Sequence, residues 1–121
     1  MTAIITVLAG LFTAQAPTPA VARFAVRDEH VRITASDRPL ATYVFGDAAV
    51  RRPYFAHVHA PSGVQVTRNH PPIPGKDAVD HATMHPGIWL AFGDVSGADF
   101  WRNQGTVKHA GFIATPGKRG V

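Results

Sequence analysis

Five of the seven histidines lie between positions 57 and 85, and four of these five form two pairs with different spacings. His57 and His59 lie two residues apart and would share one face of a strand, whereas His81 and His85 lie four apart and would stack on one face of a helical turn. Either spacing can bring two imidazoles to one metal ion. The competing interpretation is that these histidines are solvated polar residues or form ordinary hydrogen bonds.

Acid–base chemistry is the second use that these residue types allow. A histidine beside an aspartate can transfer a proton near neutral pH. Asp80 and His81 are neighbours in sequence, but neighbours on a strand point in opposite directions. We therefore expect His81 or His85 to pair with Asp94 across a turn, which makes these three the candidate catalytic residues.

Aromatic residues gather between positions 89 and 101. Trp89 and Phe92 are expected to pack in the core, whereas Trp101 can offer its face to a sugar ring, whose axial C–H groups form an apolar patch. Side chains that hydrogen-bond hydroxyl groups stand close to Trp101 in the sequence. The candidate substrate-binding residues are therefore Asp80, Asp99, Trp101, Arg102 and Asn103.

The composition is that of one globular domain, with 121 residues of which 45% are hydrophobic and 17% charged. The net charge is +4, but the basic residues are scattered and form no stripe with interleaved aromatics, so we expect no nucleic-acid partner. There is no cysteine, so the fold depends on its core rather than on disulfides. Glu29 is the only glutamate and lies far from the aromatic cluster, which limits mechanisms that need paired carboxylates.

The first 22 residues are expected to form a secretory signal peptide, so the protein would be exported. An uncharged apolar run extends from Ile4 to Ala14 and is too short to span a bilayer. Small residues at positions 14 and 16, and again at 20 and 22, have the form of a signal peptidase site. No later segment is apolar enough to cross a membrane.

The remaining residues favour an all-β fold, an antiparallel β-sandwich of six or seven short strands. Alternation of apolar and polar residues predicts the first strands, and many glycines and prolines separate them. Ser36 to Pro39 has turn composition, and Asn69 to Lys76 is too rich in proline for a strand. Strands are expected at 23–27, 29–34, 40–45, 53–58, 64–67, 87–92 and 106–113.

One short helix is expected over Asp77 to His85. Asp77 can cap its first turn, and Pro86 and Gly87 would end it. In the strand that follows, Ile88, Trp89 and Leu90 are core candidates.

Two sequence strings resemble a known family. Residues 80–94 read DHATMHPGIWLAFGD, and residues 97–101 read GADFW. Together with RPYF at 52–55, the Pro61 and Gly63 pair and VTR at 66–68, they are similar to the soluble family labelled "methane oxygenase PmoA", otherwise a domain of unknown function. The resemblance covers most of residues 40–110.

The resemblance implies a secreted, β-rich protein in which residues 23–121 form the N-terminal part of a larger, galactose-mutarotase-like sandwich whose C-terminal part is missing. It does not establish catalysis, and three hypotheses stay open. The first is an exported protein that binds or processes carbohydrate. The second is a metal-dependent oxygenase, as the family label says, with copper or iron held by His81, His85 and His109. The third is a non-catalytic structural module.

Overall fold

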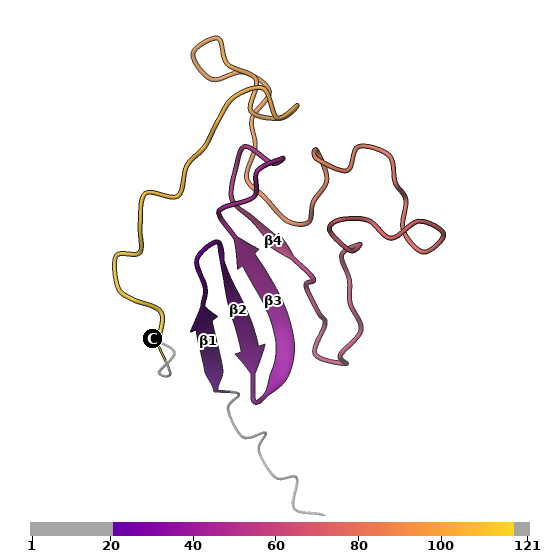
Figure 1. The fold of residues 1–121 in the computed structure, drawn as a ribbon, viewed down its shortest axis with the longest axis vertical. Helices are drawn as coiled ribbons and strands as arrows, with labels where there is room; N and C mark the ends of the chain where they lie inside the picture. Colours follow the sequence, from indigo (N-terminus) through magenta and orange to yellow (C-terminus); the bar gives the residue numbers. More distant parts are fainter. Residues whose placement is uncertain (1–20, 118–121) are drawn as a thin grey trace, which may run out of the picture.

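A computed structural model describes residues 21–117 of the chain (Figure 1). The signal peptide expected over residues 1–22 therefore lies almost entirely outside the described residues. Within the described part, the chain forms no helix that is both long enough and apolar enough to cross a membrane.

The protein is all-β, as the sequence predicted, and its ordered centre is one antiparallel sheet in the order β1-β2-β3-β4. Alternating residues explain the first two strands, because in the second of them Val31 and Ile33 face one way and Arg32 and Thr34 the other. The predictions for the first three strands are confirmed to within two residues at each end. The strands are β1 (Ala22–Val26), β2 (His30–Ala35), β3 (Arg38–Val44) and β4 (Tyr54–Ala56).

A two-residue hairpin turn joins β2 to β3. Ser36 and Asp37 both have positive φ, 46° and 67°, and the flanking Ala35 and Arg38 are paired. Positive φ at both central residues defines a type I′ turn, which matches the twist of the two strands. Pro39, expected in the turn, instead lies in β3 opposite Thr34, where the register shifts because proline has no N–H for the ladder.

The hydrophobic core lies on one face of the sheet at its β3–β4 side. Tyr54 and Ala56 of β4 are buried with Val50, and Val44 and Trp89 pack against them. The opposite face carries paired rows such as Val31, Tyr43 and Phe55. There the last described segment runs back past β1 (Figure 1) and places Phe112 and Pro116 against the sheet.

The expected sandwich of six or seven strands is not formed, because in residues 21–117 only four segments make strands. The strand predicted at 53–58 ends at Ala56, since His57 has a φ of 50°. The segments predicted at 64–67 and 87–92 make one isolated bridge each, His59 to Gln65 and Phe55 to Ile88. The segment predicted at 106–113 makes no strand. Frequent glycines, prolines and positive φ values interrupt each of these ladders.

Three of the four core candidates in the 87–92 segment are wrong, and one of these is Phe92, which is 55% exposed. Ile88 is 54% exposed and Leu90 is 78% exposed, whereas Trp89 between them packs against the core. A single bridge to the sheet edge leaves the outer side of this segment without a covering layer in the described structure.

Candidate functional site

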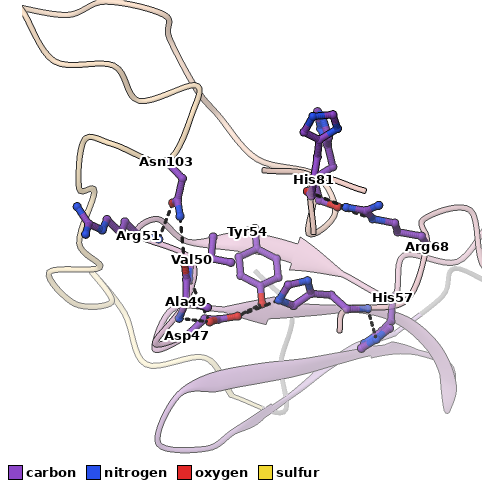
Figure 2. Close-up of polar contacts among 11 residues, drawn as sticks. Asp47, Ala49, Val50, Arg51, Tyr54, His57, Arg68, His81 and Asn103 are labelled. Carbon is purple, nitrogen blue, oxygen red and sulfur yellow. Dashed lines mark hydrogen bonds and ion pairs between the residues drawn. The ribbon is translucent and has the colours of Figure 1, made fainter. Parts of the chain in front are cut away.

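Arg68 organises the segment that was expected to be helical. Its guanidinium donates four hydrogen bonds of 2.7–2.9 Å, and all four acceptors are backbone carbonyls, those of Ala78, Asp80, His81 and His85. Figure 2 shows Arg68 reaching the main chain at His81. A helix would direct these carbonyls along its own axis, so the helix predicted over residues 77–85 is wrong. Only one turn remains, in which Met84 and His85 donate to the carbonyl of His81.

Asp77 points back into the proline-rich loop instead of capping a helix. Its carboxylate accepts hydrogen bonds from the Asn69 backbone and side chain and from the Ile73 backbone, at 2.8–3.1 Å. The hydrogen bond from the Asn69 side chain is the main reason that the pKa of Asp77 is lowered. Asp77 and Arg68 thus fix the two consecutive loops that carry His81 and His85.

These loops and the segments that follow them place four rings next to one another in a row, named here the aromatic row: His81, His85, Trp89 and Trp101. Successive ring centroids lie 5.8, 5.3 and 6.0 Å apart, within the range in which aromatic rings interact. The two histidines are exposed, Trp101 is 47% exposed, and Trp89 anchors the row to the core. The rings of Trp89 and Trp101 are therefore in contact, although of these two only Trp101 was expected to face a ligand.

Charged side chains flank both ends of the aromatic row. Asp80 accepts a hydrogen bond from Nδ1 of His81 at 3.0 Å, which is possible because His81 has a φ of 50° and the chain turns between them. Asp99 accepts hydrogen bonds from the Trp101 and Arg102 backbones and from the Arg102 side chain. The pKa of Asp80 is lowered mainly by the hydrogen bond from His81, and that of Asp99 mainly by the bond from the Arg102 backbone.

Three other predicted site residues have structural contacts elsewhere. Asp94 accepts a hydrogen bond from the Gly97 N–H within its own turn, and within residues 21–117 it does not form the expected pair with His81 or His85. Asn103 links the Arg51 N–H to the Ala49 carbonyl. His109 lies in a different cluster, with Nδ1 3.2 Å from the Tyr43 hydroxyl and its ring against Phe45 and Phe112.

The three proposed metal ligands do not lie at one place. His81 and His85 lie together, but His109 does not join them, and residues 21–117 contain no group of three His, Asp or Glu side chains placed to hold an ion. His57 and His59 follow the end of β4, and Nδ1 of His59 lies 2.7 Å from the His57 carbonyl oxygen. They do not share a strand face as their spacing had suggested.

Arg52 lies beneath the aromatic row and was not singled out by its sequence context. Its side chain is 4% exposed, and its guanidinium lies over Trp89, with Cζ 5.1 Å from the ring centroid. Nη1 donates to the Phe100 carbonyl and Nη2 to the Met84 carbonyl, both at 3.0 Å. Arg52 therefore holds the segments before and after Trp89 together. In the sequence, Arg52 is the second residue of an Arg-Arg pair before a strand, and this position did not predict its role.

A largely buried polar cluster of Asp47, Tyr54 and His70 lies next to the site, since Tyr54 belongs to the core against which Trp89 packs. Figure 2 shows Asp47 and Tyr54 of this cluster. The Tyr54 hydroxyl donates to Oδ2 of Asp47 at 2.6 Å, and Nε2 of His70 lies 3.0 Å from the same oxygen. Oδ1 of Asp47 accepts hydrogen bonds from the backbone N–H groups of Ala49 and Val50. Burial alone would raise the pKa of Asp47, but these hydrogen bonds together lower it. Burial and the nearby carboxylate raise the pKa of Tyr54.

The fold and site together define an all-β protein with one four-stranded antiparallel sheet and an exposed aromatic row on the loops beyond its last strand. The chain belongs to the family of unknown function DUF6807, whose model matches residues 30–120. No curated protein and no solved structure matches it.

Proposed function

We propose that this protein binds carbohydrate on the aromatic row and that it does so outside the cell. The observation that carries the proposal is the row itself, in which four rings follow one another at spacings of 5.3–6.0 Å with their planes tilted by 49–86° from one ring to the next. Sugar rings can stack on the exposed faces of such rings. Such a row recognises a chain of sugar units better than it recognises a small compact ligand.

Polar side chains beside the row suit sugar hydroxyl groups. Asp80 and Asp99 offer carboxylate oxygens as acceptors, and Arg102 offers guanidinium N–H donors at an exposed position. The hydrogen bond of Asp80 with His81 and that of Asp99 with Arg102 fix the two carboxylates in place before any ligand arrives, which lowers the conformational entropy lost on binding. Export is supported by the apolar, uncharged run near the start of the sequence, which has the form of a signal peptide.

The electrostatics favour recognition over glycoside hydrolysis. A hydrolase generally needs one carboxylic acid with a raised pKa to protonate the leaving group. The pKa values of both Asp80 and Asp99 are lowered, so both are charged near neutral pH. They are therefore suited to accept hydrogen bonds from hydroxyl groups and not to donate a proton.

Replacing Trp101 by alanine is expected to weaken glycan binding about tenfold or more, or about 1.4 kcal/mol, because the exposed end of the row is lost. Binding is measured by affinity electrophoresis against a panel of soluble polysaccharides and quantified by isothermal titration calorimetry. Trp101→Phe keeps a ring at this position and should retain most of the affinity.

The control for Trp101 is Val64→Ala, since Val64 is 63% exposed and does not belong to the row. It should bind like the unmodified protein. Equal affinity of the Trp101→Ala variant and the unmodified protein would remove the basis of the proposal. So would a failure of the unmodified protein to bind any glycan of the panel.

A further inference from the structure

A hollow lies beside the aromatic row, between the start of β4 and the last loops. Its volume is about 380 Å³, near the small end of the range of roughly 300–1,000 Å³ found for ligand pockets. The wall is formed almost wholly by apolar side chains, several of them largely exposed, and includes one charged residue. The main lining residues are Arg52, Leu90, Phe92, Val95, Phe100 and Val107.

Arg52, the charged residue in this wall, is buried without a counter-ion. Its side chain is 4% exposed, and within residues 21–117 it forms no ion pair with any carboxylate. Its charge is met by two backbone carbonyls, the Asn103 Oδ1 atom at 3.5 Å and the Trp89 ring, while Nε has no hydrogen-bond partner. Burial accordingly lowers the pKa of Arg52. A buried charge is costly unless it is paired and fully hydrogen-bonded.

We infer that this pocket binds a small aryl carboxylate, whose acid group pairs with Arg52 and whose ring packs among the apolar side chains. The carboxylate supplies the missing counter-ion, and a guanidinium suits a planar anion because its N–H groups form a rigid fork. The ring is placed with Phe92 and Phe100, which both line the pocket. The site is separate from the sugar-binding surface proposed above, because none of the four rings of the aromatic row lines it.

The pairing with Arg52 determines which ligands are excluded. A neutral molecule of the same shape leaves Arg52 without a counter-ion and gains only from burial of its apolar part. A cationic analogue is repelled by the guanidinium. Charge selectivity therefore distinguishes the proposed site from simple adsorption on an apolar surface.

The test uses the full-length protein and three probes with the same ring: 3-phenylpropanoate, 3-phenylpropan-1-ol and 3-phenylpropylamine. Binding is measured by isothermal titration calorimetry. It is also measured by tryptophan fluorescence in the Trp101→Phe variant, which leaves Trp89, the ring that Arg52 lies over, as the only tryptophan. We expect the carboxylate to bind at least tenfold more tightly than the alcohol, and the amine to bind most weakly. Equal binding of all three probes, or of none, would overturn the inference.

Substitutions at the exposed wall avoid disturbing the buried arginine. Leu90 lines the pocket and is 78% exposed, so Leu90→Glu should fold normally while its carboxylate repels the ligand and competes for Arg52. We expect it to lower 3-phenylpropanoate affinity at least tenfold. Val64→Glu adds the same charge at another exposed position and should leave the affinity unchanged. If both variants bind like the unmodified protein, the ligand is not in this pocket and the inference is wrong.

Discussion

Replacing Asp47 by alanine is expected to lower the free energy of unfolding by about 3–5 kcal/mol, the cost of removing one member of a buried charged network. Four hydrogen bonds end on this carboxylate, from the Tyr54 hydroxyl, His70 and two backbone N–H groups. Alanine leaves these donors in a largely buried place without an acceptor. Small domains have about 5–15 kcal/mol of stability in total, so the variant should be near the limit of folding.

Urea denaturation of the variants measures this effect. Asp47→Asn keeps one acceptor oxygen for the two backbone donors and should therefore lose less than Asp47→Ala. Asp94→Ala is the matched control, because Asp94 is exposed and accepts one hydrogen bond from Gly97, and it should cost about 1 kcal/mol or less. If the Asp47→Ala and Asp94→Ala variants are equally stable, Asp47 does not stabilise the core against which Trp89 packs, and this interpretation is wrong.

The same carboxylate predicts how stability depends on pH. The pKa of Asp47 in the folded protein is lowered, because its hydrogen bonds together outweigh the opposing effect of burial. A lowered folded-state pKa contributes stability that is fully present above the unfolded-state value of about 3.9 and is lost as the pH falls through the folded-state value. The free energy of unfolding should therefore decrease on acidification below about pH 4–5. Asp47→Asn should show a shallower decrease, measured by urea denaturation at several pH values.

The first half of the sheet was predictable because local signals agree there. Alternation of apolar and polar residues in β1 and β2 has period two, and a short polar turn separates β2 from β3. Beyond Ala56 the same kind of signal failed. Residues such as Ile88 and Leu90 look like a strand, but only a single bridge with Phe55 attaches them to the sheet, and a strand needs a partner along its whole length.

The site was predictable in its parts but not in its arrangement. Trp101 and its polar neighbours were identified because residue type alone suggests what they can bind. The expected helix failed because Arg68, nine residues before Asp77, takes the carbonyls that a helix would use. No periodic pattern predicts the roles of Arg52 and Asp47, since these roles depend on contacts with residues distant in sequence.

Replacing Gly87 by alanine is expected to detach the segment bearing Trp89 from the sheet and to cost about 3 kcal/mol or more. A Cβ atom on Gly87 would lie 2.0 Å from the Phe55 carbonyl oxygen and 2.9 Å from its carbon. Both belong to the backbone of β4, so no side chain can move aside. The collision falls on the bridge in which Phe55 and Ile88 exchange hydrogen bonds of 2.8 and 2.9 Å.

Gly93→Ala provides the matched control, six residues further along the same segment. Nothing lies within 4 Å of a Cβ built on Gly93, and its φ is not positive. An alanine that fits generally stabilises by about 0.4–1 kcal/mol, because it restricts the unfolded chain. Thermal unfolding and glycan binding should separate the two variants: Gly87→Ala should lose stability together with affinity, since Trp89 anchors the aromatic row, and Gly93→Ala should keep both. A Gly87→Ala variant as stable as Gly93→Ala would show that the close contact between Gly87 and β4 does not exist in the protein.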